Sequence, residues 1–389
     1  MSGDRRSFLR TAAATAASYS RIHGAAGRIR IAGLGTGGRC RYLMSLAGKQ
    51  PGVELVAACD VYEPRRAETA AKIAPGAQQT DDYRRVLDRR DVDAVIIGSP
   101  DHWHVPMTVD AVRAGKDVYV EKPLTKTIEE GALAEKAVAE TGRIVQVGYQ
   151  QRSWEHFRAA REIVAAGKLG KITLVLSSWY QNYTRFDPSN ASVQADKLDW
   201  KRWLGPAPPQ PVSAVRYFRW RWFWDFGGGH LTDLHSHYGD VIHWFMNAYQ
   251  PKDALAAGGN HVLDYLECPD TINCVWTYPG FTLVYNGTLV CSLEGGNIIF
   301  RGTRAMMKIN RDGFAVYPEG VVPPERTHYP EPETAMKSAH DGTIDHMANW
   351  LECIRSRKEP NAPVRLCAAA AAAAHLGNLA YRRGSRVTA

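Results

Sequence analysis

Three side chains in this sequence have types and a spacing that suit acid–base chemistry on a small molecule. Lys122 lies in the segment Glu121-Lys122-Pro123, directly after a short apolar run. An amine at the carboxyl end of a parallel strand can reach the crevice where doubly wound sheets bind ligands, and the following proline restricts the turn. Asp233 and His237 are four residues apart in a predicted helix. The carboxylate could then hold the imidazole tautomer while the other ring nitrogen faces a substrate hydroxyl.

Two other interpretations of this helix stay open. Asp233 could be an amino-terminal carboxylate beside a partly buried histidine, with no part in chemistry. His230, Asp233, His235 and His237 are also residue types that bind zinc. His235 is out of phase with the other three on a regular helix, so we expect no metal site, with ligand geometry as the deciding test.

A Gly-x-Gly-x-x-Gly pattern at 33–38 lies between an apolar strand and a helix-sized segment. The glycines would give a tight turn, a close approach of the backbone to a pyrophosphate, and close helix packing, with the pyrophosphate at the helix amino terminus. The candidate cofactor-binding residues of this turn are Gly33, Gly35, Thr36, Gly37 and Gly38.

Asp60 ends the second predicted strand, where a carboxylate accepts hydrogen bonds from the adenosine ribose hydroxyls. It would repel a 2′-phosphate, so we expect NAD rather than NADP. We also expect the cofactor to be tightly bound. Arg65 and Arg66 keep NADP open, although a solvated helix face explains these arginines better than a 2′-phosphate site does.

Polar and aromatic residues gather at 98–104, after a further strand. The carboxyl ends of such strands are where open parallel sheets bind ligands, so we expect cofactor contacts here. The candidates are Ser99, Pro100, His102 and His104. The alternative is that the histidines merely begin a helix that Asp101 caps.

Short apolar strands alternate with helical stretches over residues 28–150, which predicts a parallel sheet covered on both faces. The predicted strands are 28–32, 53–59, 93–97, 117–120 and 143–147, and the predicted helices include 105–114 and 128–140. From residue 151 the pattern changes to a helix at 154–166, a strand at 171–176 and then, over 271–317, strands that read as antiparallel hairpins. The turns expected between them are Pro279-Gly280, Asn286-Gly287, Gly295-Gly296 and Asp312-Gly313.

The remaining segments complete a two-domain α/β organisation. Helices are expected at 343–357 and 367–381, and these helices could pack back on the first domain. Seven consecutive alanines in the second of them would allow close packing.

Aromatic residues alternate at 218–224 with the period of a strand, which suits core packing or stacking on sugar rings. The expected domains are 28–150, a doubly wound parallel sheet, and 151–389, an α/β domain with an open, mainly antiparallel sheet.

The net charge and the cysteines argue against some classes of function. The chain has 389 residues and a net charge of +8, of which +5 comes from the first thirty residues. The remaining +3 gives no support for nucleic-acid binding, which needs clustered Lys and Arg on the folded body. Seven cysteines without a Cys-x-x-Cys pair argue against a zinc ribbon or a disulfide scaffold and are expected to be mostly buried thiols.

Residues 1–27 are expected to be a leader. Arg5-Arg6 with Phe8-Leu9, followed by a mildly apolar alanine-rich stretch, resembles a twin-arginine export signal, so we expect export of the folded protein to the periplasm. Asp4 and the lack of an Ala-x-Ala site depart from that pattern, which leaves an uncleaved leader and a disordered basic tail as alternatives. No stretch reaches the roughly 18 apolar residues of a membrane helix.

These motifs together resemble the Gfo/Idh/MocA oxidoreductase family. The residues that carry the resemblance are Gly33, Gly35, Gly38, Asp60, Ser99-Pro100, His104, Glu121-Lys122-Pro123, residues 148–152, Trp203-Leu204-Gly205-Pro206, residues 227–229, Asp233 and His237. The resemblance implies an amino-terminal Rossmann domain and a carboxyl-terminal α/β domain. It adds Glu121, Lys122, Gln150 and Trp203 to the cofactor-binding candidates. His235 departs from the family's glycine, which puts substrate orientation in doubt.

The resemblance also implies an activity. Lys122, Asp233 and His237 would be catalytic in an NAD(P)-dependent oxidoreductase that transfers a hydride between the nicotinamide and a hydroxyl of a sugar or glycoside. We expect homo-oligomers formed through the carboxyl-terminal sheet. Two alternatives remain, namely a redox-neutral glycosidase that oxidises its sugar transiently with bound NAD, and a non-catalytic sugar-binding protein on the same fold.

Overall fold

The computed structural model describes residues 27–320 and 329–389. The expected export leader lies outside the described residues, except for Gly27. The first domain contains a six-stranded parallel sheet in the order β3-β2-β1-β4-β5-β6. Its strands are β1 (Ile29–Leu34), β2 (Val53–Cys59), β3 (Gln78–Thr80), β4 (Ala94–Ile97), β5 (Asp117–Val120) and β6 (Val145–Val147).

Helices cover both faces of this sheet, which confirms the predicted doubly wound architecture. They are α2 (Gly38–Gly48), α3 (Glu63–Lys72), α4 (Tyr83–Leu87), α5 (His104–Arg113) and α6 (Glu130–Thr141). Strands β4 and β5 are buried along their whole length, as expected for apolar strands between two helical layers. The polar strand β3 lacks this apolar pattern and was not predicted.

The second domain contains a nine-stranded sheet in the order β14-β13-β12-β11-β7-β10-β9-β8-β15. Its strands are β7 (Ile172–Tyr180), β8 (Asp253–Gly259), β9 (Thr271–Tyr278), β10 (Phe281–Thr288), β11 (Gly296–Gly302), β12 (Ala305–Asn310), β13 (Gly313–Pro318), β14 (Thr334–Lys337) and β15 (Val387–Thr388). The sheet is mainly antiparallel, as predicted, but β7 and β10 pair in parallel.

The predicted turn at Asn286-Gly287 is wrong, because both residues lie inside β10. Asn286 pairs with Asn273 of β9 and with Ser178 of β7. A Cβ on Gly287 would lie 2.7 Å from the His230 ring, so this glycine permits close packing rather than a turn.

The predicted strand at 218–224 is also wrong. Residues Ala214–Arg219 form helix α9, and Trp220–Trp222 continue it as a short 3₁₀ turn. The Ser213 side chain accepts a hydrogen bond from the Arg216 backbone N–H, so a helix start outweighs the alternating pattern. Trp222 is buried in the core of the second domain, while Trp220 lies at a cavity wall.

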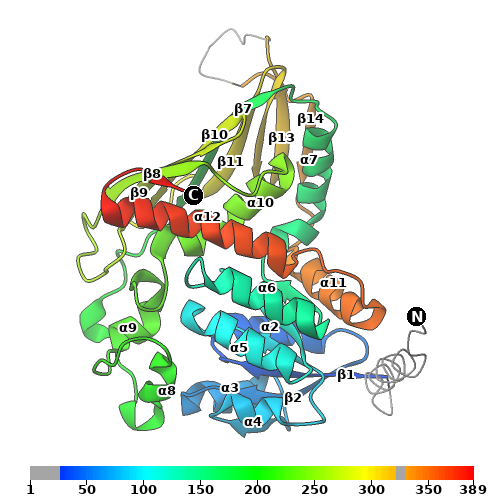
Figure 1. Cartoon of the computed structure of the whole chain (residues 1–389), viewed down its shortest axis with the longest axis vertical. Coiled ribbons are helices and arrows are strands. Elements are labelled where there is room, and N and C mark those ends of the chain that lie inside the picture. The colour runs from blue at the N-terminus through cyan, green and yellow to red at the C-terminus, as the bar shows by residue number, and fades with distance from the viewer. Residues whose placement is uncertain (1–26, 321–328) are drawn as a thin grey trace, which may run out of the picture.

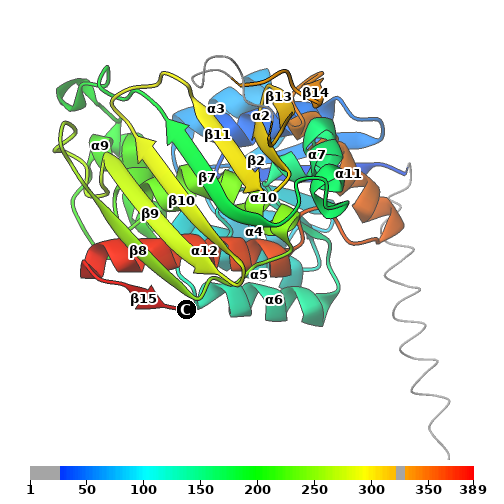
Figure 2. The same ribbon diagram turned by 90° about the horizontal axis from the view of Figure 1, so that it is seen from above.

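One face of the second sheet is covered by helices, among them α7 (Glu155–Ala165) and α10 (Ser236–Met246) (Figure 2). The last two helices, α11 (Thr343–Ser356) and α12 (Val364–Arg383), reach both domains. Figure 1 shows α12 crossing the molecule between the second sheet and α6. The amino-terminal part of α12 packs in the core of the first domain and its later part packs in the core of the second, while α11 packs on the other face of the first sheet.

Two further observations concern the described residues alone. Six of the seven cysteines are buried and Cys291 is exposed, and all are free thiols. No helix in ranges 27–320 and 329–389 is long and apolar enough to cross a membrane.

Candidate active site

A cavity of about 320 Å³ opens at the carboxyl edge of the first sheet, where the strand order reverses between β1 and β4. Gly35 follows β1 with φ at 71°, and a Cβ there would lie 2.7 Å from Ser99 Cα after β4. Helix α2 begins at this cavity with no side-chain cap and no acidic residue in its first turn. Its free N–H groups therefore suit an anionic group such as a pyrophosphate. We call this space the first cavity.

The glycines that allow close helix packing are not the ones that were predicted. A Cβ on Gly38 would meet nothing within 4 Å, so the expected role of Gly38 in helix packing is wrong. That role falls to Gly33, where a Cβ would collide with Met44 Sδ, and to Gly98, where a Cβ would lie 2.7 Å from Cys40 Cβ. Gly37 and Gly38 line the first cavity, whereas Thr36 is fully buried behind it.

Asp60, which follows β2, lines the first cavity at the place where the adenosine of a dinucleotide is expected. Its Oδ1 accepts a hydrogen bond from the Tyr62 backbone N–H at 2.9 Å, and burial raises the pKa of this carboxyl. Arg65 also lines the cavity, with its guanidinium 4.6 Å from the Tyr217 ring centroid. Pro100 and Trp203 complete this wall, and Trp203 comes from helix α8 (Trp200–Leu204) of the second domain.

His102 does not line the first cavity, nor the second cavity that is described below, so the expected contact of His102 with the cofactor is not found. Its Nε2 donates to the Trp203 backbone oxygen at 3.0 Å, and its ring packs 5.3 Å from the Phe226 ring. Burial lowers the pKa of His102 to about 4, so the ring is neutral. His102 therefore holds Trp203 in place from behind.

A second cavity of about 260 Å³ adjoins the first, and the two share wall residues. The shared residues are Arg39, Gly98, Ser99, Trp220 and Arg221. His104, Glu121, Lys122 and Gln150 line the second cavity from the first domain. The His104 nitrogens lie 2.6 Å from Pro123 O and 2.9 Å from Ser99 O, so this ring joins the two loops that follow β4 and β5.

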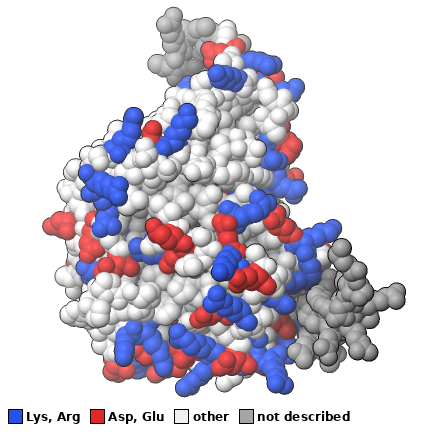
Figure 3. All heavy atoms as spheres, viewed as in Figure 1, with Lys and Arg blue, Asp and Glu red and all other residues white. Residues whose placement is uncertain are grey.

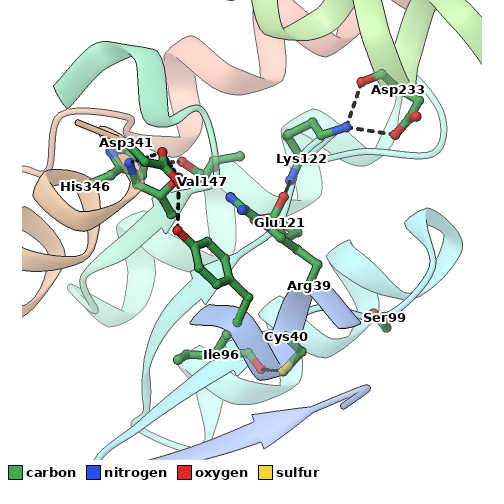
Figure 4. A network of polar contacts seen from close by, with 12 residues as sticks. Arg39, Cys40, Ile96, Ser99, Glu121, Lys122, Val147, Asp233, Asp341 and His346 are labelled. Atoms are coloured by element: carbon green, nitrogen blue, oxygen red, sulfur yellow. Dashed lines mark hydrogen bonds and ion pairs between the residues drawn. The ribbon is translucent and has the colours of Figure 1, made fainter. Parts of the chain in front are cut away.

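Lys122 points across the domain boundary to Asp233 (Figure 4). Its Nζ donates to Asp233 O at 2.7 Å and to Asp233 Oδ1 at 2.8 Å, and its peptide bond to Pro123 is cis. Behind it, Arg39 Nε donates to Glu121 Oε1 at 2.8 Å. Burial would raise the pKa of Glu121, but Arg39 and Lys122 hold it below its usual value.

Asp233 and His237 do not form the predicted pair. Residues Leu231–His235 form a π-helical turn before α10, which changes the angular relation of the two side chains. Asp233 Oδ1 instead accepts from Lys122 and, at 3.0 Å, from Arg221 Nε. Burial would raise the pKa of Asp233, but the two cations lower it, so the carboxylate is ionised.

His237 is nevertheless brought to the same cavity as Lys122. Its ring stacks on Trp179 with centroids 5.5 Å apart, and it makes no hydrogen bond with any described residue. Burial, aided by Lys122, Arg311 and other cations, lowers its pKa well below 6.5. The buried ring is therefore a neutral imidazole with an unused proton acceptor.

The other histidines of this segment face away from the cavity. His230 lies near Tyr285 and the Asp270 backbone oxygen, and His235 stacks on Trp276 at 4.6 Å. No group of three or more candidate metal ligands occurs within residues 27–320 and 329–389. The departure at His235 thus affects the domain core rather than the cavity.

Sequence reasoning missed several residues of the second cavity: Arg39, Trp179, Gln181, Arg221 and Arg311. Arg39 directly follows the glycine pattern at 33–38, and Arg221 lies in the aromatic segment at 218–224. Both segments had been named as candidates, although these two arginines had not. Trp179 and Arg311 lie on a strand and in a hairpin turn without a local signal. They reach the cavity only through the tertiary fold.

Two family descriptions match the chain. One, "Oxidoreductase family, NAD-binding Rossmann fold" of Gfo/Idh/MocA, matches residues 28–149. The other, the C-terminal alpha/beta domain of that family, matches residues 161–387. This chain belongs to the Gfo/Idh/MocA oxidoreductase family. Its first domain is accordingly an NAD-binding Rossmann domain.

Relatives include inositol dehydrogenases. The chain is 35% identical over 159 residues to scyllo-inositol 2-dehydrogenase (NAD(+)) of Bacillus subtilis, covering 41% of this chain and 45% of that protein. It is 33% identical over 163 residues to inositol 2-dehydrogenase of Rubrobacter xylanophilus, covering 41% and 46%. The match thus spans less than half the length of each relative.

Solved structures share the fold over nearly the whole chain. Levoglucosan dehydrogenase in complex with NADH and levoglucosan superposes with a TM-score of 0.73 at 17% identity, covering 93% of this chain and 99% of that one. The myo-inositol 2-dehydrogenase from Lactobacillus plantarum gives 0.69 at 19% identity, covering 93% and 99%. At these identities the likeness establishes the common fold alone.

Proposed function

We propose that this protein is an NAD-dependent dehydrogenase that oxidises a ring hydroxyl of a sugar, a glycoside or a polyol of similar shape. One observation carries the proposal: Lys122 and His237, from different domains, line one cavity that adjoins the first cavity at the glycine turn. The activities of the inositol and levoglucosan dehydrogenases support the substrate class.

The residues divide the chemistry of an alcohol oxidation between them. NAD, when bound, supplies a hydride acceptor. Lys122, held by Asp233, donates a hydrogen bond to the substrate oxygen and stabilises the negative charge that develops there. The neutral ring of His237 accepts the hydroxyl proton on its unprotonated nitrogen. Asp233 acts as a positioning residue for Lys122 and Arg221 rather than for His237.

NAD rather than NADP is the proposed cofactor. Asp60 lines the first cavity where the adenosine ribose is expected, and a carboxylate there repels a 2′-phosphate. Tight binding is supported by the enclosure of the first cavity between both domains, with Tyr217 and Trp203 of the second domain in its wall.

The test starts from denatured purified protein, from which released nucleotide is identified by mass. NAD-loaded enzyme is then offered sugars, glycosides and inositols while the absorbance of NADH and the products are followed. NADH formation with oxidation of a hydroxyl supports the proposal. Glycoside cleavage without net NADH would assign the redox-neutral hydrolysis instead. Absence of any nucleotide or turnover would favour a binding protein.

We also propose export by the twin-arginine route and association into homo-oligomers. Export is supported by Arg5-Arg6 and the apolar stretch that follows them.

Homo-oligomers are supported by the face of the second sheet that the helices leave uncovered. The half-buried side chains of Leu174, Leu176 and Val284 lie on that face. Cell fractionation of an Arg5→Lys, Arg6→Lys double variant and sedimentation of the purified protein test these two proposals.

A further inference from the structure

The second cavity has an excess of positive charge. Four cationic side chains line it, Arg39, Lys122, Arg221 and Arg311, against the carboxylates of Glu121 and Asp233. On the face shown in Figure 3, by contrast, Lys and Arg are interspersed with Asp and Glu. An oxidised nicotinamide ring would bring a further positive charge to the cavity. A neutral substrate would leave this excess uncompensated.

The ion pairs inside the cavity show which cation is unmatched. Arg39 pairs with Glu121 at 2.8 Å, and Lys122 and Arg221 both pair with Asp233. The buried Arg152, outside the cavity, likewise makes a double hydrogen bond to Asp240. Arg311 differs from these residues.

Arg311 lies in the hairpin turn between β12 and β13. Its guanidinium lies 4.9 Å from the centroid of the Trp179 ring, and it makes no ion pair with a carboxylate of residues 27–320 or 329–389. Its Nε is buried without a hydrogen-bond partner. Burial lowers the pKa of Arg311, and the charges of Asp341 and Glu121 oppose this shift without cancelling it.

An unpaired guanidinium beside a sugar-sized cavity is suited to one type of ligand group. Arginine presents a planar fork of donors that matches a carboxylate with two parallel hydrogen bonds. The contact with Trp179 restricts the motion of this guanidinium before a ligand arrives, which lowers the entropy lost on binding. Trp179 also stacks on His237, so the anion-binding group and the proton acceptor share one support.

We propose that the substrate is a sugar acid, whose carboxylate is bound by Arg311 while a ring hydroxyl lies between Lys122 and His237. This inference rests on the proposed dehydrogenase function and specifies its substrate class. A singly charged carboxylate matches the one unpaired guanidinium. The pyrophosphate of the cofactor does not use Arg311, because it is expected at the glycine turn in the first cavity, which Arg311 does not line.

The test measures binding to NADH-loaded enzyme by tryptophan fluorescence, using acid and neutral partners: glucuronate with glucose, and galacturonate with galactose. At least one acid should bind roughly 10- to 100-fold more tightly than its neutral partner, the range for hydrogen bonds between charged groups. Arg311→Met should remove this preference and Arg311→Lys should retain part of it.

Arg382→Met is the matched control. The Arg382 guanidinium also lies over a tryptophan ring, 5.3 Å from the Trp224 centroid, but Arg382 is exposed and lies outside both cavities. This variant should keep the acid preference. Equal binding of acid and neutral sugars, binding of neither, or an acid preference that survives in Arg311→Met would overturn the inference. Tighter binding of glucose 6-phosphate than of either acid would overturn the carboxylate assignment.

The two proposals fail in different ways. NADH formation from neutral sugars without any acid preference would leave the dehydrogenase standing and remove the sugar acid. Acid binding that depends on Arg311, combined with no redox change in NAD for any sugar, would support the carboxylate site and remove the dehydrogenase.

Discussion

Lys122 Nζ lies 2.7 Å from the backbone oxygen of Asp233 and 2.8 Å from its Oδ1, so one ammonium group joins the loop after β5 to the π-helical turn of the second domain. The side chains of both residues are about one-tenth exposed, at 9% and 10%. This contact connects the proposed chemistry to the arrangement of the two domains.

Replacing Lys122 with Ala should lower kcat by about 10²–10³, the range for loss of a hydrogen-bond donor that stabilises a developing negative charge. The nucleotide should remain bound, since the glycine turn is untouched. Steady-state kinetics and the mass of released nucleotide measure the two effects. Lys136→Ala, on the exposed face of α6, serves as the control. Near-native turnover in Lys122→Ala would remove this residue from the mechanism.

Asp233→Asn should destabilise the protein as well as slow it. The substitution leaves Lys122 and Arg221 without their shared counter-charge, and breaking a buried pair from one side costs about 3–5 kcal/mol. The pKa of Asp233 is lowered in the folded state, so its stabilising effect is complete above the unfolded value of 3.8 and is lost as pH falls through the folded pKa. Denaturant unfolding at pH 7 therefore measures the whole effect. An unchanged midpoint would show that the pair contributes nothing.

The pH dependence of kcat/KM should report the neutral state of His237. Burial and the neighbouring cations lower its pKa well below 6.5, so the proton-accepting form persists to lower pH than for an ordinary histidine. We expect the acid limb of the profile below pH 6.5. Lys122→Met should move the pKa of His237 upward, which proton NMR of the histidine ring can follow. An acid limb above 6.5, or activity retained in His237→Gln, would contradict the assignment.

Gly35→Ala should abolish nucleotide binding. The residue has φ at 71°, and a Cβ there would press on the Ser99 backbone at 2.7 Å and push apart the loops that follow β1 and β4. Gly76→Ala is the matched control, because Gly76 has φ at 83° but a Cβ there meets nothing within 4 Å. Calorimetric titration with NAD separates the two. Equal affinity in both variants would show that the clash is relieved without cost to the site.

The sequence predicted the first domain well because its strands are continuous apolar runs with glycines and charged residues at their carboxyl ends. Lys122, Asp60 and the glycine turn were found for that reason. The relation between Asp233 and His237 was missed, because spacing on a regular helix says nothing about a π-helical turn. Arg311 and Trp179 carry no signal in their own segments, since only the pairing of β7 with β11 and of β11 with β12 brings their strands together. Local patterns located the chemistry, and tertiary packing decided its partners.

Helix α12 has a consequence for how the protein is made. Val364, Cys367 and Ala368 complete the core of the NAD-binding domain, although some two hundred residues separate them from its last strand. When the Rossmann strands have left the ribosome, the core on the α5 and α6 side of their sheet therefore still lacks the part that α12 supplies. The first domain therefore reaches its final fold only after residues 364–370 have been made, so its assembly waits for most of the second domain.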